Sequence, residues 1–472
     1  MRVFLPFTLL LALGLSGCPD DEEGTTSAEA GGDTTSGGEN TGIDPAAGGG
    51  SETDPGWDGD PDDPGGGGET GSGTEGGSET EPEEPGSAWG SPVAETGRPL
   101  PPRRPMNASA RQSYQSGINA AQAGSVSQAR QSFEAALSAD SNAYKAAYNL
   151  GVLADRAGNE RQALEFYQRA LRIQADYERA AEGIVAIYVR RGDVPQAISF
   201  IEPLARQWER NLYLQALHAE TLVHANRLDD AVLAARRALR RDERFVPAMV
   251  AIVKASLRRG RNELAETVID QALRIDDNDA ELHYLRGRML LEEEGRLRGA
   301  LAELRRAVEL RPDYVEARMA LGIQLLTGAN YTEALQQFQA AEQLAPMSVE
   351  VHLNLADAYR ANKQWQQAKA TFERALSMRS DLPQAHFNLG LMYMAAGEEF
   401  PGLDRLTALQ RAAEEFRTYR NGMGPRLPRD DPSEGYLEDL NRQIEREQRR
   451  IQRDQERQQR EAERAARGEE TG

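Results

Sequence analysis

The sequence predicts an all-α superhelix of about nine stacked two-helix units, preceded by a disordered linker and followed by a charged C-terminal helix. Three observations favour this fold. Compact residues recur every 34 residues, each unit holds two stretches whose apolar residues are three or four positions apart, and turn signals separate these stretches. A single unit cannot bury both of its apolar faces, so a row of units supplies the core.

The chain opens with the pattern of a signal peptide at residues 1–18. Arg2 supplies one positive charge, and the apolar run 3–15 is too short to span a bilayer as a mature helix. The run ends in Leu-Ser-Gly-Cys at 15–18, which is similar to the lipobox of bacterial lipoproteins. This resemblance implies lipidation of Cys18 and anchoring in a bacterial cell envelope, with the outer membrane facing the periplasm as the expected site. An ordinary secretory signal with an incidental Cys is the alternative.

Residues 19–106 predict a disordered, acidic, Gly-rich linker. Between residues 19 and 100 lie 22 of the 44 Gly and 21 acidic residues against a single base, Arg98, so this stretch carries the −20 of the whole chain. Such a segment buries too little apolar surface to offset the entropy of its backbone. It is interpreted as a spacer, or alternatively as an acidic segment that binds a basic partner or cations. Four prolines between Pro99 and Pro105 give it a stiffer, extended end.

Composition weighs against several classes of function. Outside the linker the chain is almost electroneutral, so it lacks the basic excess that binding to nucleic acid requires. One Cys excludes intramolecular disulfides and Cys-rich metal sites, and five His make a multi-ligand metal centre hard to build. We therefore expect no metal, no cofactor and no nucleic acid.

The repeats occupy residues 107–421. Compact residues form one series, with steps of 34 residues and one of 35: Gly117, Gly151, Val185, Ala219, Val253, Gly287, Gly322, Ala356 and Gly390. An alanine series starts at Ala129, and a series of mostly larger residues starts at Phe133. These positions resemble the tetratricopeptide repeat, whose Leu-Gly signature is present at 150–151, 321–322 and 389–390. The resemblance implies helical hairpins that stack into a superhelix with a concave groove for other proteins.

Two irregularities interrupt the period. The 35-residue step is attributed to one extra residue in the turn 292–297. In the ninth unit about ten residues, including 399–406, are inserted before Ala412 and Phe416 resume the pattern. The register of this unit is left open, and it is expected to act as a modified cap.

The concave groove is predicted from the geometry that the resemblance implies, in which the second residue of each unit faces it. These residues are basic near the N-terminus and acidic further along, and an apolar strip follows the acidic ones. Such a surface is suited to an extended segment or a helix of a partner protein. Solvated charge and packing between helices are the alternative interpretation. The predicted partner-binding residues are Arg111, Lys145, Arg179, Glu281, Glu316, Glu350, Met319, Ile323, Leu353, Phe387 and Leu391.

The sequence offers no catalytic constellation. It contains no nucleophile elbow, metalloprotease motif or nucleotide-binding loop in the folded region. His283, His352 and His386 occupy one repeat position and are interpreted as packing residues, because equivalent positions of stacked units are too far apart to share an ion. We predict that the chain is not an enzyme and has no small-molecule substrate.

After a linker at 422–436, residues 437–467 predict a charged α-helix. Leu437, Leu440, Ile444 and Ile451 form a short apolar seam in a sequence rich in Arg, Glu and Gln. A solvated helix held by pairs of opposite charge four residues apart is one interpretation. A short coiled-coil contact through the seam is the other.

The order of signal, acidic spacer, repeats and charged tail resembles that of tetratricopeptide lipoproteins of gliding bacteria. This resemblance implies a lipid-anchored scaffold that binds other envelope proteins as part of a gliding motility complex. A pilotin-like lipoprotein, or one that assists the assembly of outer-membrane proteins, is the alternative.

Overall fold

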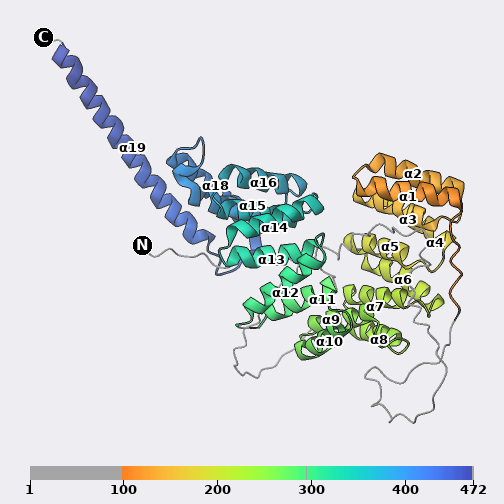
Figure 1. The fold of residues 1–472 in the computed structure, drawn as a ribbon. Coiled ribbons are helices and arrows are strands. Elements are labelled where there is room, and N and C mark those ends of the chain that lie inside the picture. Colours follow the sequence, from red (N-terminus) through yellow and green to blue (C-terminus); the bar gives the residue numbers. More distant parts are fainter. Residues whose placement is uncertain (1–97, 294, 470–472) are drawn as a thin grey trace, which may run out of the picture. The chain divides into compact units, whose positions relative to one another are not determined.

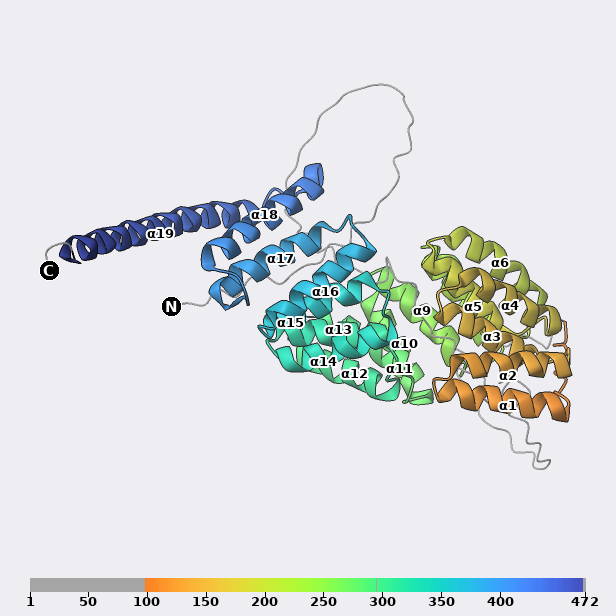
Figure 2. The same ribbon diagram turned by 90° about the horizontal axis from the view of Figure 1, so that it is seen from above.

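The computed structural model describes residues 98–293 and 295–469, which are helical and contain no strand (Figures 1 and 2). The predicted all-α fold is therefore confirmed. The signal peptide, Cys18 and the linker as far as residue 97 lie outside the described residues. The chain divides into two compact units, Met1–Met289 and Leu290–Gly472, which are described separately.

The first unit holds ten helices and most of an eleventh in its described residues. They are α1 (Ala108–Gln122), α2 (Val126–Ala139), α3 (Tyr144–Arg156), α4 (Glu160–Ile173), α5 (Glu178–Arg190), α6 (Val194–Gln207), α7 (Leu212–His224), α8 (Leu228–Leu239), α9 (Val246–Arg258), α10 (Asn262–Ile275) and α11 (Ala280–Leu291). The cap of α1 is Asn107, whose side chain accepts a hydrogen bond from the amide of Ala110 at 2.9 Å.

The second unit begins at the end of α11. Its helices are α12 (Leu297–Leu310), α13 (Val315–Thr327), α14 (Tyr331–Leu344), α15 (Val349–Ala361), α16 (Trp365–Met378), α17 (Pro383–Ala396), α18 (Arg405–Met423) and α19 (Ser433–Glu469), with the 3-10 turns η2 (Gly397–Glu399) and η3 (Gly424–Arg426).

The helices of each unit form two layers. From α1 to α10 and from α12 to α19 successive helices pack on one another, and odd-numbered helices also contact the next odd-numbered helix, as in α3·α5, α5·α7 and α13·α15. No two even-numbered helices pack comparably in the described part of the chain. The odd-numbered helices therefore form the inner layer, which is the layer that the repeat pattern predicts to line a groove.

Compact residues of the inner helices pack against aromatic rings of the outer helices. A Cβ atom added to Gly151 would lie 2.5 Å from ring carbons of Tyr167, and one added to Gly183 of the next repeat would lie 2.7 Å from the same ring. Gly117 and Gly322 face Phe133 and Phe338 in the same way. The small-to-large pairing expected from the 34-residue period is thus present within a repeat and between repeats.

The two irregularities lie where the sequence placed them. The longer step falls between the end of α11 at Leu291 and the start of α12 at Leu297. In the ninth repeat the inserted residues form η2 and the loop before α18, and a Cβ atom on Gly390 would meet the ring of Phe416 at 3.0 Å. The ninth repeat therefore has the same register as the others, with α18 as its second helix.

The C-terminal helix is longer than the predicted 437–467. It starts at Ser433, because the side chain of Asp431 accepts a hydrogen bond from the Ser433 amide at 2.9 Å and another from the Tyr419 hydroxyl at 2.6 Å. Of the predicted seam, Leu437, Leu440 and Ile444 pack on the last repeat, and Leu440 is fully buried. This part of the seam serves as a cap on the repeats, and the helix continues beyond it as a charged rod.

Residues 98–106 depart from the predicted linker. They lie against the first repeats, with Met106 buried in the core of α1–α5 and its carbonyl 3.3 Å from Nη2 of Arg111. Prolines stiffen this segment, so holding it in place costs less conformational entropy than holding Gly-rich chain. The folded region therefore starts before the predicted boundary at residue 107.

Candidate functional site

The charged residues predicted for the groove lie near the start of inner helices. Five of the six are the second residue of their helix, and Arg111 is the fourth of α1. Their exposure differs widely, since Arg179 is exposed and Lys145 is 2% exposed. Lys145 is therefore a buried residue of α3, whereas Arg111, Glu281, Glu316 and Glu350 are partly exposed.

Glu281 belongs to a ladder of charges across three inner helices. Its carboxylate lies 2.6 Å from Nζ of Lys254 on α9, and Glu220 on α7 pairs with the same ammonium group. Burial opposes the charge of Lys254, but the two carboxylates outweigh burial and raise the pKa of this lysine. The ladder fixes α7, α9 and α11 to one another, and two carboxylates share one positive charge.

Glu350 joins the start of α15 to the end of α16, the two helices of one repeat. Its Oε1 lies 3.3 Å from Nη2 of Arg379 at the end of α16, and its Oε2 lies 3.3 Å from the Ser348 hydroxyl that caps α15. With these two partners in place, the Glu350 side chain is still 35% exposed to solvent. Such a part-exposed pair stabilises weakly, so Glu350 remains able to meet a basic group of a partner.

Three residues of the predicted apolar strip pack in the core. Leu353 and Leu391 are 2% and 8% exposed in the cluster that joins α15–α19. The Phe387 ring contacts those of Phe416 and Tyr419 at centroid distances of 5.5 and 5.0 Å. These three side chains therefore pack between helices.

Apolar surface is accessible on α13. Ile323 is 36% exposed, and Met319 is half-buried against the small cluster of Ala341, Ala345 and Val351. Glu316 precedes Met319 by three residues and Ile323 by seven, so the three lie on one face of α13, and Glu350 occupies the position of Glu316 on the next inner helix, α15. We call Glu316, Met319, Ile323 and Glu350 the inner patch.

A buried polar cluster lies on the neighbouring inner helices. The carboxylate of Asp357 accepts a hydrogen bond from Nε of Arg360 at 2.9 Å and one from Nδ2 of Asn388 at 3.0 Å. Burial raises the pKa of Asp357, and Arg360 counteracts it. The Asn388 amide oxygen is buried without a hydrogen-bond partner among the described residues.

The sequence marks this cluster by a break in one of the repeated apolar positions, which the 34-residue period alone does not predict. Asp357 stands 34 residues from both Ile323 and Leu391, so a carboxylate replaces an apolar side chain at an inner position. A charged residue in an apolar series requires a polar partner, and Asn388 on the next repeat supplies it.

Two of the three histidines hold the loop that precedes their own helix. His283 Nε2 is 3.0 Å from the Asp277 carbonyl oxygen, and His352 Nε2 is 3.0 Å from that of Pro346, six residues back in both cases. His386 instead pairs with Glu415 at 2.7 Å. These contacts support a structural role for the repeat position, as expected.

Among the described residues, no three His, Cys, Asp or Glu side chains are grouped closely enough to hold a metal ion. Within residues 98–293 and 295–469, each helix is either too short or too polar to cross a bilayer.

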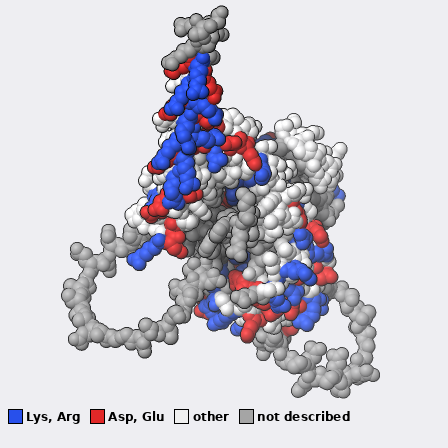
Figure 3. Space-filling view, turned by 90° about the vertical axis from the view of Figure 1, so that its left-hand side faces the viewer, with Lys and Arg blue, Asp and Glu red and all other residues white. Residues whose placement is uncertain are grey.

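Basic side chains follow α19 beyond its packed start (Figure 3). Arginines recur three or four residues apart, and several pair along the helix, for example Arg449 with Glu445 at 3.2 Å and Arg460 with Glu456 at 3.9 Å. These pairs support the interpretation of a solvated helix, since each adds about 0.3–0.5 kcal/mol to helix stability.

Comparison with known proteins identifies the repeats. One model of the tetratricopeptide repeat matches residues 222–289 and 325–389, and a second matches 114–178 and 292–348. No curated protein matches the chain.

Solved structures of repeat proteins are similar to parts of the chain. MamA from Desulfovibrio magneticus is 24% identical over 37% of this chain and 96% of its own, with a TM-score of 0.33. The repeat protein TTC0263 of Thermus thermophilus is 24% identical over 39% of this chain and 100% of its own, with a TM-score of 0.34. A repeat protein of Parabacteroides merdae is 17% identical over 56% of this chain and 98% of its own, with a TM-score of 0.34.

Proposed function

We propose, from the tetratricopeptide repeats that this chain carries, that it is a scaffold which binds other proteins of a bacterial envelope while a lipid on Cys18 holds it at the membrane. Tetratricopeptide repeats serve protein–protein interaction, and nothing in the described residues indicates catalysis. The observation that carries the binding role is the inner patch. It combines exposed apolar surface at Ile323 with the part-exposed side chain of Glu350 and with Glu316, one carboxylate oxygen of which is buried.

The chemistry of the inner patch favours a segment with an apolar anchor and basic flanks. The anchor would cover Ile323 and Met319, and the basic residues would approach Glu316 and Glu350. A short amphipathic helix or an extended peptide satisfies this description.

A substitution in the patch tests the binding role. Ile323→Asp should abolish capture of the partner by chemical crosslinking in native envelopes, because it places a charge where the apolar anchor binds. Leu297→Asp is the matched control, since Leu297 is 48% exposed but lies on the outer helix α12. Mass spectrometry identifies the crosslinked proteins. Equal capture by both variants would place the binding surface elsewhere.

The anchor rests on the sequence alone. The Leu-Ser-Gly-Cys motif supports lipidation of Cys18, and three acyl chains of the kind lipoproteins carry would hold the chain durably, since each buried CH2 contributes about 0.8 kcal/mol. Cys18→Ala should move the protein from the membrane fraction to the soluble one. Ser16→Ala keeps a small residue in the motif and should stay with the membrane. Retention of the Cys18→Ala variant would disprove the anchor.

We further propose that the scaffold serves in the outer membrane, facing the periplasm, as a component of the adventurous gliding motility machinery. The support is the resemblance of the overall order of segments to lipoproteins of gliding bacteria. Deleting the gene should impair gliding. Unchanged motility, with barrel precursors or secretin subunits as the crosslinked partners, would favour an assembly lipoprotein instead.

A further inference from the structure

Residues 98–106, which we call the strap, run beside the turns that join the first repeats (Figure 1, orange trace). The sequence of the strap is Arg-Pro-Leu-Pro-Pro-Arg-Arg-Pro-Met, so four prolines keep it extended and three arginines make it basic. Its side chains contact Trp208 near one end and the acidic turn before α5 in the middle. The strap therefore shows what kind of segment this edge of the repeats can bind.

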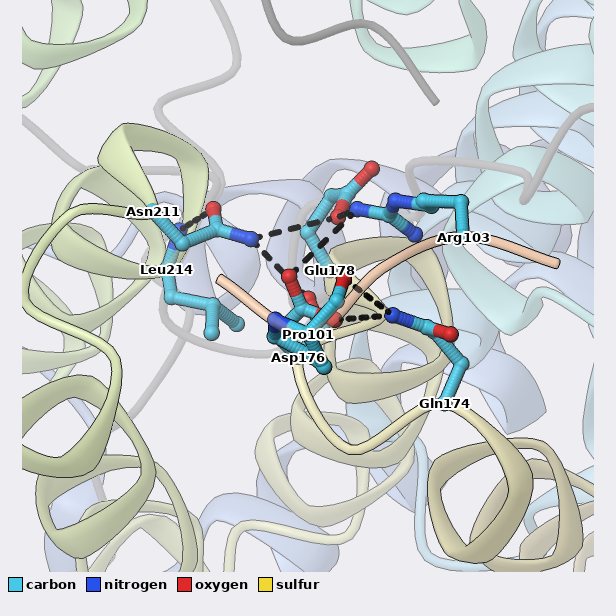
Figure 4. Close-up of polar contacts among 7 residues, drawn as sticks. All are labelled: Pro101, Arg103, Gln174, Asp176, Glu178, Asn211 and Leu214. Carbon is cyan, nitrogen blue, oxygen red and sulfur yellow. Dashed lines mark hydrogen bonds and ion pairs between the residues drawn. The ribbon is translucent and has the colours of Figure 1, made fainter. Parts of the chain in front are cut away.

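The centre of the contact is a pocket for the Arg103 guanidinium (Figure 4). Nη2 of Arg103 lies 3.0 Å from Oε2 of Glu178 and 3.7 Å from Oδ2 of Asp176. The Asp176 side chain is fully buried, and those of Arg103 and Glu178 are 16% and 15% exposed. The Arg103 carbon Cζ lies 5.8 Å from the centroid of the Tyr177 ring. Burial opposes the charge, but the two acids outweigh it and raise the pKa of Arg103.

Two amide side chains hold this pocket in shape. Gln174 Nε2 donates to Oδ1 of Asp176 at 2.7 Å and to the Pro101 carbonyl of the strap at 3.3 Å. Asn211 Nδ2 donates to the Asp176 carbonyl at 2.9 Å and to Oε2 of Glu178 at 3.4 Å, while its Oδ1 caps α7. The pocket is thus built by the turns before α5 and α7, and hydrogen bonds among its own residues hold Asp176 and Glu178.

A second contact lies further along the strap. The guanidinium carbon of Arg98 is 4.7 Å from the centroid of the Trp208 ring, at the end of α6. A cation over an indole face contributes about 0.5–1 kcal/mol at such a site. The edge therefore recognises two arginines five residues apart, with an acceptor carbonyl between them.

The strap uses the central pocket incompletely. Nη1 of Arg103 and Oδ2 of Asp176 are both buried without a hydrogen-bond partner among the described residues. A guanidinium seated slightly deeper could bond both carboxylates, and a bidentate arrangement is the stronger geometry for this pair. An arginine on a separate polypeptide is not limited by the attachment of the strap at Met106, and so can reach this position.

We propose that the edge pocket of Gln174, Asp176, Glu178 and Asn211 is a recognition site for an arginine in a proline-rich, extended segment of a partner protein, and that the strap occupies it in cis until such a partner displaces it. This proposal rests on the scaffold function, and it names the chemistry of one partner. It requires neither the inner patch nor the anchor, so it can fail while they hold.

Occupation in cis sets the affinity that a partner needs. A short tether gives the strap an effective concentration of about 1–10 mM. If the free segment binds with a Kd of about 100 μM, the cis strap weakens an external competitor about 10- to 100-fold. Removing the strap from the pocket should raise the affinity for the competitor by the same factor of about 10 to 100.

The test uses the full chain and a fluorescent peptide with the sequence of residues 98–106. Arg103→Glu should eject the strap and raise the affinity for the peptide at least 10-fold over wild type. Arg104→Glu is the matched control, because it makes the same charge change at an exposed neighbour and should leave the affinity as in wild type. Adding Asp176→Asn to the Arg103→Glu chain should abolish binding, and a peptide with Glu at the Arg103 position should not bind.

Two further measurements complete the test: hydrogen exchange reports on the strap amides, and sedimentation reports on self-association of the chain. Amides of the strap should exchange faster in Arg103→Glu than in Arg104→Glu, while those of α3–α7 remain protected. Equal peptide binding by the two variants, no binding by either, or unchanged exchange of the strap would overturn the proposal. Self-association of the wild-type chain that Arg103→Glu abolishes would also overturn it, because the occupant would then be the strap of a second copy.

Discussion

At the scale of single residues, contact between a glycine and an aromatic ring sets how closely the two helices of a repeat approach. The Tyr167 ring lies between Gly151 of its own repeat and Gly183 of the next, and a Cβ atom on either would lie within 2.7 Å of it. The ring cannot yield to one side without meeting the other. A methyl group at this point must therefore push two repeats apart.

We accordingly expect Gly151→Ala to destabilise the first unit by about 1–3 kcal/mol, the usual effect of overpacking a core. Denaturant unfolding followed by circular dichroism measures the change. Gly299→Ala is the control, since its Cβ atom would be 3.5 Å from Leu290, an ordinary contact. A loss in the control as large as that in Gly151→Ala would show that the helix backbone, rather than the ring, is responsible.

A second residue-scale effect concerns His218, which is 7% exposed on α7. Burial, reinforced by Arg237 and partly offset by Glu202, lowers its pKa from 6.5 to about 4. Between pH 4 and pH 6.5, His218 therefore binds a proton in the unfolded chain but stays neutral in the folded chain. The stability that this residue contributes is complete above pH 6.5 and is lost as the pH falls towards 4.

From this shift we predict that the wild-type chain loses about 2 kcal/mol more than His218→Gln between pH 7 and pH 5. Unfolding by urea at the two pH values, with both proteins, gives the difference. Other titrating groups are common to the two proteins and cancel. Parallel losses in wild type and variant would mean that His218 does not prefer the neutral form in the folded state.

At the scale of elements, α19 is held by its first turns. Leu440 is fully buried against the last repeat, and the Tyr436 ring lies 5.3 Å from that of Phe416. Beyond these turns the helix is held by pairs of its own charges, such as Arg457 with Asp454 at 3.3 Å. The first turns thus close the core of the repeats, and the rest contributes little to that core.

Leu440→Ala should therefore cost about 2–5 kcal/mol in the second unit, as expected for a buried leucine with few ways to relax. Amide exchange across residues 433–444 should rise at the same time, because the cap opens. Leu297→Ala, at a position 48% exposed, should change stability by less than about 0.5 kcal/mol. Exchange in 433–444 that stays at the wild-type rate would show that α19 is held by other contacts.

The elements also show how far the sequence predicts the fold. The 34-residue period predicted the helix pairs and the site of the extra residue before Leu297, while the register of the ninth repeat became clear only from the contact between Gly390 and Phe416. These features depend on neighbours within one or two repeats, which the period encodes directly. The start of α19 was missed because its cap comes from Asp431, outside the apolar pattern.

Prediction of the candidate site was less complete, for a physical reason. Equivalent positions have the same direction in every repeat, but exposure depends on what packs over each one. Ile323 and Leu391 occupy the same repeat position, yet the first is 36% exposed and the second is 8% exposed in the C-terminal cluster. The strap was predicted to be part of the linker because its sequence is rich in Pro and Arg. Its binding depends on Asp176 and Glu178, which only the fold places beside Arg103.

At the scale of the whole molecule, the division between Met289 and Leu290 predicts how the chain unfolds. Stability in stacked repeats is a sum of repeat terms and contacts between neighbours, so a weak junction separates cooperative regions. The division lies in the last turn of α11, directly before the longest connection between the two helices of any of the first eight repeats, residues 292–296. We expect two unfolding transitions in calorimetry, one for each unit.

The two destabilising substitutions identify these transitions. Gly151→Ala lies in the first unit and should lower the midpoint of one transition, and Leu440→Ala lies in the second and should lower the other. The double variant should show both shifts with no interaction between them, because Tyr167, which Gly151 contacts, and Leu440 belong to separate core clusters. If either substitution alone lowered both midpoints equally, the repeats would unfold as one cooperative array, and the junction at Leu290 would have no thermodynamic meaning.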